Sequence, residues 1–197
     1  MGLKNYLRFI QRAYLLLYRT GMLKYNSNYD YHYFVKHLVD KGEVVIDIGA
    51  NIGYYSLLFA RWVGDSGKVF AVEPNRVYNE VFSERAKKYK NITLYPYALE
   101  NETQMLKPSV LFENLDKIDY IKCDIEGHEY FILSDMKEII RKFKPKVQVK
   151  VLPENREKLF ELFEELGYTP YKLYKYRLIP QDGDTYPVKG DYIFIEA

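Results

Sequence analysis

The stretch Val44-Val-Ile-Asp-Ile-Gly-Ala-Asn-Ile-Gly53 decides the fold of this chain. An apolar strand ends near an acid and runs directly into a loop, in which the glycines at positions 49 and 53 flank Asn51. Glycine lets the backbone turn sharply and lets a ligand approach the main chain, while the helix predicted from Tyr54 to Val63 directs its first N–H groups towards that ligand. The stretch therefore predicts a nucleotide-type loop between a strand and a helix.

The spacing of the glycines excludes the dinucleotide-binding fingerprint. That fingerprint requires glycine at its first, third and sixth positions, which here would be Gly49, Asn51 and Tyr54. Two glycines four residues apart instead resemble the cofactor loop of S-adenosylmethionine-dependent methyltransferases. The loop thus favours an adenosyl ligand other than NAD.

A second buried strand, Lys68-Val-Phe-Ala-Val-Glu73, closes on a carboxylate roughly twenty residues after the loop. An acid at this spacing can accept hydrogen bonds from both ribose hydroxyls, and Pro74 could lie against one face of an adenine ring. The alternative is that Glu73 only caps the strand and Pro74 only starts a turn. The spacing from Gly49 and Gly53 favours the ligand.

Composition limits the protein class. With 197 residues and 48% hydrophobic content, the chain can bury a sizeable core, and we expect a helical extension over residues 1–40 and one α/β domain over residues 41–197. A net charge of +2 gives no strong electrostatic case for a nucleic-acid partner. The single cysteine, Cys123, excludes an internal disulfide framework and a cysteine-based zinc site.

Residues 1–28 predict one amphipathic helix with basic residues between apolar ones. The longest wholly apolar run extends from Ala13 to Tyr18. A membrane span needs about twenty residues, so this run is far too short. No signal-peptide cleavage site is recognisable, so we expect a cytoplasmic protein. Two alternatives stay open for this helix, namely peripheral contact with a membrane surface and coverage of a core or a partner subunit.

From residue 44 onwards, strand patterns alternate with helix patterns, which is typical of a parallel sheet with helices on both faces. We expect a Rossmann-like, mostly parallel sheet of seven strands with a C-terminal antiparallel hairpin around the turn at Gln181–Asp184. The strands are predicted near 44–48, 68–72, 92–97, 118–123, 146–151 and 191–196, with one more between Tyr171 and Ile179. The helices are predicted near 53–63, 76–89, 128–142 and 154–166.

The third motif, Ile118-Asp-Tyr-Ile-Lys-Cys-Asp-Ile-Glu-Gly-His-Glu129, runs off the carboxyl end of the fourth predicted strand, where ligands of open α/β sheets bind. Asp124, Glu126 and His128 alternate, so on an extended segment they would project to one side. Carboxylates there would favour a positively charged sulfonium, and His128 could take the proton of an alcohol acceptor. Alternatively, His128 only bonds the loop at the start of a helix.

Together, Asp47-Ile-Gly-Ala-Asn-Ile-Gly-Tyr-Tyr-Ser56, Glu73-Pro-Asn75 and Ile121-Lys-Cys-Asp-Ile-Glu-Gly-His-Glu129 resemble an FkbM-type methyltransferase over about residues 41–135. The resemblance implies S-adenosylmethionine as cofactor and O-methylation of a hydroxyl on a sugar or small natural product. Carried over by position, it implies the following roles. Asp47, Gly49, Asn51 and Gly53 would surround the methionine and ribose, Glu73 would bind the ribose, Pro74 and Ala98 would border the adenine, Asp124 would face the methionine end, and Glu126 and His128 would border the acceptor.

Two departures from the family leave the acceptor open. The connection from Leu99 to Lys117 is short, and Lys150 stands where relatives tend to carry an acid. The Asn/Asp-Pro-Pro-aromatic motif of amino-methylating enzymes is missing, because Asp124-Ile-Glu-Gly stands in its place. Asp124 with Glu126 is a weak Mg²⁺ site, and no metal is expected. The alternative to an enzyme is a non-catalytic relative that serves as an interaction or nucleic-acid-binding module.

Overall fold

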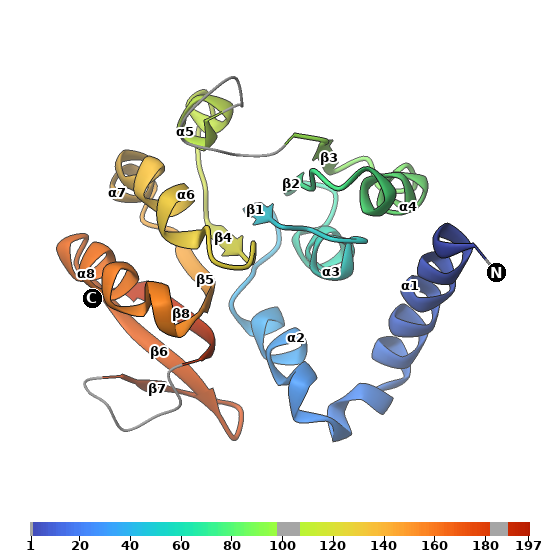
Figure 1. Cartoon of the computed structure of the whole chain (residues 1–197), viewed down its shortest axis with the longest axis horizontal. Helices are drawn as coiled ribbons and strands as arrows, with labels where there is room; N and C mark the ends of the chain where they lie inside the picture. Colours follow the sequence, from blue (N-terminus) through green and yellow to red (C-terminus); the bar gives the residue numbers. More distant parts are fainter. Residues whose placement is uncertain (1, 98–106, 182–188) are drawn as a thin grey trace. The chain divides into compact units, whose positions relative to one another are not determined.

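The computed structural model describes residues 2–97, 107–181 and 189–197. The chain forms two compact units, Met1–Pro96 and Tyr97–Ala197 (Figure 1). Within the described ranges, no helix combines the length and the apolar character that crossing a membrane requires.

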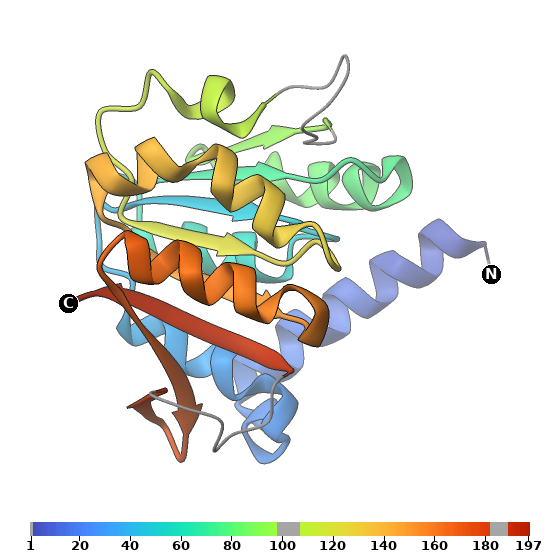
Figure 2. The ribbon, with the colours of Figure 1, turned by 60° about the vertical axis from the view of Figure 1, so that its left-hand side comes forward.

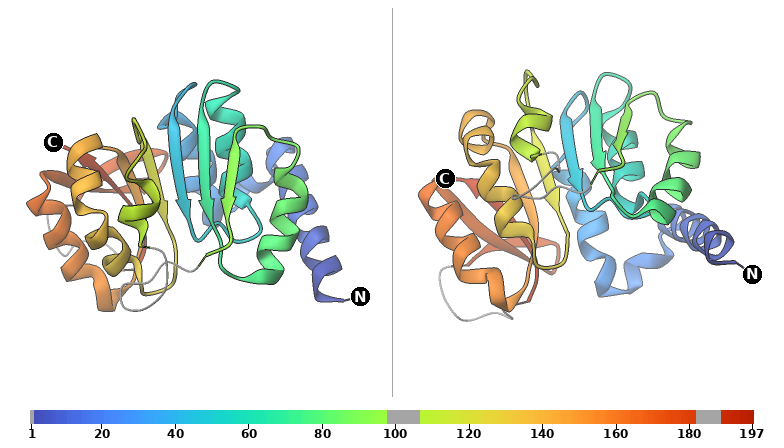
Figure 3. Two further views of the ribbon diagram at one scale, coloured as in Figure 1. Left: turned by 90° about the horizontal axis from the view of Figure 1, so that it is seen from above. Right: turned by 45° about the horizontal axis from the view of Figure 1, so that its top comes forward.

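The first unit contains three parallel strands in the order β3-β2-β1 (Figure 3). They are β1 (Val44–Ile48), β2 (Lys68–Val72) and β3 (Ile92–Tyr95). The residues of β1 from Val45 and of β2 from Val69 are buried, as expected for strands that are covered on both faces. Because the strands are parallel, the loops after β1 and β2 leave from the same edge of the sheet.

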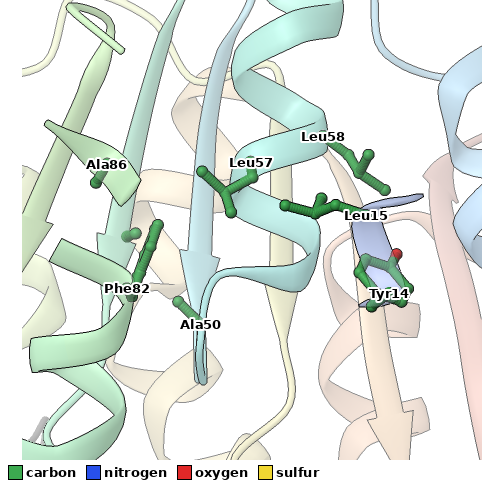
Figure 4. Packing of buried hydrophobic residues seen from close by; sticks show 8 residues of the cluster. Tyr14, Leu15, Ala50, Leu57, Leu58, Phe82 and Ala86 are labelled. Carbon is green, nitrogen blue, oxygen red and sulfur yellow. The ribbon is translucent and has the colours of Figure 1, made fainter. Parts of the chain in front are cut away.

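Three longer helices pack around these strands: α1 (Leu3–Thr20), α3 (Tyr54–Val63) and α4 (Arg76–Ala86). Figure 4 shows the core to which α1, α3 and α4 contribute, with Phe82 next to Ala50 and Leu15 next to Leu58. Its buried members are Tyr14, Leu15, Ala50, Leu57, Leu58, Ala71, Phe82 and Ala86. Helix α1 therefore covers part of a core, which is one of the two alternatives that the sequence left open for residues 1–28.

Short helical segments connect α1 to β1. They are η1 (Met22–Tyr25), η2 (Ser27–Tyr29), α2 (Asp30–Phe34) and η3 (Val35–His37). Gly21, in the left-handed conformation with φ of 78°, ends α1, and its N–H bonds back to the last turn of that helix. The chain can therefore turn sharply there and return towards α3.

The second unit contains five strands in the order β4-β5-β8-β6-β7. They are β4 (Tyr120–Cys123), β5 (Lys146–Val151), β6 (Tyr168–Tyr174), β7 (Arg177–Pro180) and β8 (Gly190–Glu196). Strands β4 and β5 are parallel, whereas β5 with β8, β8 with β6, and β6 with β7 are antiparallel. The mostly parallel Rossmann-like arrangement with an antiparallel C-terminal part was predicted and is confirmed.

The helices of this unit are α5 (Pro108–Phe112), α6 (Glu129–Asp135), α7 (Lys137–Phe143), η4 (Pro153–Asn155) and α8 (Arg156–Glu165). Figure 2 shows α8 running alongside β8. Aromatic rings hold the two together, since Phe163 stacks on Phe194 with a centroid distance of 3.9 Å and Phe160 meets Tyr192 edge-on at 5.3 Å. Phe163 and Phe194 are both fully buried, so this contact belongs to the core of the unit.

Two predicted elements are wrong in number. The residues that the structure describes form eight strands and not seven, because the strand expected between Tyr171 and Ile179 is the β6–β7 hairpin. Its turn is formed by Lys175 and Tyr176 at positive φ of 47° and 59°, and neither residue type signals a left-handed turn. The helix expected over 128–142 is divided at Met136 into α6 and α7. Most of the turn predicted at residues 181–184 lies outside the described residues.

Candidate functional site

The loop after β1 turns through three left-handed residues, Gly49, Asn51 and Gly53, with φ of 80°, 53° and 85°. The N–H groups of Gly49 and Ala50 both donate to the carbonyl of Val72 at 3.0 Å, which fixes the loop to the end of β2. The Asn51 side chain accepts the Ile52 N–H at 2.8 Å, a local bond of the kind that lets asparagine adopt this conformation. The predicted tight loop is thus confirmed in its geometry.

Gly53 is required by packing as well as by its dihedral angles. A Cβ atom added there would lie 2.4 Å from the ring of Phe82 in α4, far inside van der Waals contact. The beginning of α3 and the buried face of α4 can approach this closely only because position 53 has no side chain. Sequence reasoning attributed this glycine to the sharp turn and to ligand approach, and it missed the helix contact.

Glu73 joins the loops that follow β1 and β2. Its side chain is buried, with 6% of the residue exposed. Oε2 accepts the Asn51 N–H at 2.7 Å, and Oε1 accepts the Asn75 N–H at 2.8 Å. Burial raises the pKa of Glu73, the two backbone bonds oppose that rise, and the nearby Asp47 adds to it. Each carboxylate oxygen has a second lone pair with which a ligand hydroxyl can bond.

Asp47 is completely buried, and its Oδ2 accepts the Ser56 hydroxyl at 2.5 Å. This bond ties the end of β1 to the first turn of α3, so Asp47 holds the shape of the loop between them. Asn51 and Pro74, in contrast, are exposed on the two loops. The structure therefore gathers six of the predicted residues at one strand edge: Asp47, Gly49, Asn51, Gly53, Glu73 and Pro74. Ala98 lies outside the described residues.

In the second unit, the segment after β4 is not the extended stretch that was predicted. Residues 125–127 form successive bends, with Glu126 at φ of 50° and Gly127 at φ of 100°. The alternation of Asp124, Glu126 and His128 consequently does not place them on one side of a strand. Glu126 and His128 are exposed, and His128 is the N-cap residue of α6 without a side-chain capping bond.

Asp124 lies between two lysines of the neighbouring strands. Lys150 of β5 approaches it at 3.2 Å, and the almost fully buried Lys122 of β4 approaches it at 3.6 Å. Lys150, which stands where members of the family tend to carry an acid, thus pairs with Asp124, the acid that the resemblance places at the methionine end of the cofactor. Within this unit, the negative charge of Asp124 is compensated, so a cation would compete with both lysines for it.

Glu129 is a residue whose role sequence reasoning missed, although the third motif contains it. It is completely buried at the first position of α6. Its carboxylate accepts the N–H groups of Ile125 at 3.2 Å and Gly127 at 2.9 Å, and the Asn155 side-chain amide at 2.7 Å. An acid in the first turn of a helix, two residues after a glycine, is a signal for such back-bonding onto the preceding loop.

A cavity of about 350 Å³ lies in the first unit beside the beginning of α3. Its walls are mostly aromatic and aliphatic and come from α1, the connecting segments and α3: Ile10, Ala13, Tyr14, Leu17, Leu23, Tyr29, His32 and Tyr54. The Tyr14 hydroxyl and His32 Nδ1 form a hydrogen bond of 2.6 Å, and burial raises the pKa of Tyr14. The adjacent Gln11 donates to the Ile52 carbonyl at 2.6 Å, so α1 contacts both the cavity and the loop after β1.

Comparisons with known proteins concern the fold and the family resemblance. Residues 102–170 match the profile of the methyltransferase FkbM domain. No curated protein sequence matches the chain. Across the described part of the chain, no group of three His, Cys, Asp or Glu residues is arranged to hold a metal ion.

Three solved structures illustrate the fold. An S-adenosylmethionine-dependent O-methyltransferase from Thermotoga maritima has a TM-score of 0.56 and 20% identity over 85% of this chain and 64% of its own. The precorrin-6y C5,15-methyltransferase from Geobacter metallireducens scores 0.55 with 17% identity, covering 84% and 86%. Aeropyrum pernix fibrillarin, with natively bound S-adenosyl-L-methionine, scores 0.56 with 11% identity, covering 80% and 68%.

The methyltransferase fold and the resemblance to FkbM-type methyltransferases are therefore confirmed. The chain spans less than two thirds of the length of the Thermotoga enzyme, and identities at this level establish the fold alone.

Proposed function

We propose that this chain is an S-adenosylmethionine-dependent methyltransferase that methylates a hydroxyl of a sugar or small natural product. The observation that carries the proposal is Glu73, a buried carboxylate fixed at the end of β2 and bonded to the loop after β1. The match to the FkbM domain supports the class of reaction. We retain the division into a helical extension over residues 1–40 and a cofactor-binding domain over residues 41–197.

The residues of the first unit fit the cofactor. Glu73 keeps one lone pair on each oxygen, which suits the two ribose hydroxyls, and the glycine loop leaves the backbone open to the methionine part. The exposed ring of Pro74 offers an apolar face to adenine. When bound, S-adenosylmethionine supplies a methyl group on a positively charged sulfur, which an oxygen nucleophile can accept.

For the acceptor, we carry the roles of Asp124, Glu126 and His128 over from the resemblance. His128 is exposed, so its imidazole can reach a dissolved acceptor and take the proton of the hydroxyl as the new bond to carbon forms. Lys122 and Lys150 hold the carboxylate of Asp124, which makes Asp124 a positioning residue for this loop in our proposal.

The cavity beside Tyr54 supports a small-molecule acceptor. Its volume lies within the range of ligand pockets, and the faces of Tyr14, Tyr29 and Tyr54 can stack on a ring. The competing function is a non-catalytic module that keeps the fold and binds a partner without needing the cofactor. Cytoplasmic localisation stays a prediction.

Calorimetric titration of the purified chain with S-adenosylmethionine, S-adenosylhomocysteine and NAD tests the proposal. We expect both adenosyl ligands to bind and NAD not to bind. Glu73→Gln should weaken adenosyl binding about 10- to 100-fold, because a hydrogen bond to a charged group is lost. Glu84→Gln is the matched control, since Glu84 is an exposed acid of α4 that pairs with Arg8 of α1.

Thermal unfolding of each variant without ligand separates a lost contact from a lost fold. If neither adenosyl ligand binds the folded wild-type chain at millimolar concentration, the methyltransferase proposal fails and the non-catalytic module replaces it. If binding occurs, transfer of a labelled methyl group to a panel of sugars and phenols identifies the acceptor class, and His128→Ala should then slow the transfer without weakening cofactor binding.

A further inference from the structure

Residues 1–28 carry an unusual charge distribution. They contain five Lys and Arg and no Asp or Glu, whereas the other 169 residues hold 24 Lys and Arg against 27 Asp and Glu. The positive net charge of the chain is therefore concentrated in α1 and the segment that follows it. Such a concentration indicates an anionic partner for this surface.

The same segment also exposes apolar side chains. Six of the eleven large hydrophobic residues that are exposed within the described ranges lie between residues 3 and 25. Phe9 and Leu16 of α1 are each 61% exposed, and Tyr25 is 95% exposed. The six residues are Leu3, Tyr6, Phe9, Leu16, Met22 and Tyr25. A cluster of this kind on an otherwise charged protein marks an interaction surface.

Cations and apolar groups alternate along one side of α1. Phe9, Arg12, Leu16 and Arg19 follow one another at intervals of three, four and three residues, which places them on one helix face. We call these four residues the outer stripe of α1. The opposite face contains Gln11, Tyr14 and Leu15, which are buried in the first unit. Helix α1 is thus held on one side and open on the other.

Ion pairs neutralise only part of the positive charge of α1. Lys4 pairs with Glu80 at 2.5 Å, and Arg8 forms two bonds to Glu84, at 2.5 and 2.8 Å. These contacts fix the first half of α1 to α4. Arg12 and Arg19 are exposed, and neither has an acidic partner among the residues that the structure describes. The two unpaired cations both belong to the outer stripe.

We propose that α1 lies on the surface of a membrane that contains anionic lipid, with the outer stripe as its contact. Phe9 and Leu16 would enter the boundary between head groups and acyl chains, while Arg12 and Arg19 would meet lipid phosphates. The buried face of α1 stays on its own core, so docking requires no unfolding. A helix in this plane would hold the cofactor loop near the surface through the bond from Gln11 to Ile52.

Two other partners explain the surface less well. A nucleic acid would use the cations, but it would leave Phe9 and Leu16 without a partner. A second copy of the chain, related by a two-fold axis, would bring four arginines of the two outer stripes into one contact, and the stripes supply no acid to pair with them. An anionic bilayer is the partner that satisfies both kinds of side chain at once.

The test is sedimentation of the full chain with vesicles of phosphatidylcholine and phosphatidylglycerol, compared with vesicles of phosphatidylcholine alone. We expect binding to the anionic vesicles only, and weaker binding at high salt. The Arg12→Gln, Arg19→Gln double variant should lower the partition coefficient about 30-fold, since each cation near such a surface contributes about fivefold. The Phe9→Ser, Leu16→Ser double variant should lower it at least about tenfold.

The matched control is the Lys87→Gln, Lys88→Gln double variant, which removes two exposed cations at the end of α4. It should keep the partition coefficient within about twofold of the wild type. All changes are at exposed positions, and unchanged urea midpoints would show that the fold is intact.

Equal binding to both kinds of vesicle, or a loss that the control shares, would overturn the proposal. So would a duplex RNA probe whose binding depends on Arg12 and Arg19 while vesicle sedimentation does not. A dimer in light scattering that the Phe9→Ser, Leu16→Ser variant dissociates, with no vesicle binding, would assign the stripe to a second copy.

Discussion

Two loops of this protein, residues 49–53 after β1 and residues 124–128 after β4, are each held by one buried glutamate that accepts two backbone N–H groups. The connections of the two acids differ. Glu73 bonds one amide in each of two loops, those after β1 and β2. Glu129 bonds two amides of a single loop and adds the side chain of Asn155.

This difference separates a carboxylate that a ligand can still reach from one that the protein encloses completely. Each oxygen of Glu73 accepts one protein hydrogen bond, and 6% of the residue is exposed. Oε2 of Glu129 accepts two donors, and the residue is completely buried. Two acids in similar surroundings thus differ in their exposure and in the number of donors that they accept. Glu73 suits a cofactor contact, whereas Glu129 maintains the shape of a loop.

The largest effect should come from Glu129→Ala. The substitution leaves the Ile125 and Gly127 amides and the Asn155 side chain without an acceptor in the interior, at about 1–3 kcal/mol for each group that finds no water. We expect the free energy of unfolding to fall by about 3–5 kcal/mol, measured by urea denaturation. Glu126→Ala, in the same loop but exposed, should change it by less than about 0.5 kcal/mol. Equal losses would show that Glu129 does not hold the loop.

Substitution of one glycine in each loop tests whether packing distinguishes the first loop from the second. Gly53→Ala introduces a left-handed alanine, at about 1 kcal/mol, and forces a Cβ against Phe82, so we expect a total loss of about 2–4 kcal/mol. Gly127→Ala has positive φ as well, but its Cβ would meet nothing within 4 Å, and about 1–2 kcal/mol should be lost. Urea denaturation of both variants measures the difference. If Gly127→Ala is the more damaging, packing against α4 is not what distinguishes the first loop.

The sequence revealed the first loop more completely than the second, for a physical reason. The first loop is built from signals that lie close together in the chain, namely an apolar strand, an acid and two glycines. The position of Glu73 follows from the geometry of adjacent parallel strands, which the spacing of residues reports well. Its bond to the Asn51 amide follows from the same geometry, because parallel strands bring their loops to one edge.

The structure of the second loop could not be predicted from the sequence in the same way. Its bends depend on left-handed angles at Glu126, a residue type that gives no warning of them. The contacts of Glu129 with Asn155 and of Asp124 with Lys150 join residues 26 apart in the sequence, and no local pattern reports such pairs. The turn at Lys175 and Tyr176 was missed for the same reason as the bend at Glu126, because neither residue type signals a left-handed angle, and two strands were therefore predicted as one.

The smallest expected effect is a pH dependence of the free energy of unfolding that comes from Glu73. Because burial raises the pKa of Glu73 above its usual value of 4.5, the folded chain holds this proton more tightly than the unfolded chain does. Stability from Glu73 is therefore fully present below the usual pKa and is lost as pH rises through the raised pKa. Glu73→Gln removes this titration, so the free energy of unfolding of the wild type should decline relative to the variant from pH 4 or so towards neutrality.

The measurement is urea denaturation of both proteins across that pH range, with and without saturating S-adenosylhomocysteine. Ribose hydroxyls that donate to the ionised carboxylate would stabilise its charged form and lower its pKa, so the bound ligand should flatten the decline. A relative stability that instead rises with pH in the ligand-free protein would mean that the Asn51 and Asn75 amides outweigh burial. Glu73 would then be electrostatically satisfied by the protein alone, and its proposed distinction from Glu129 would disappear.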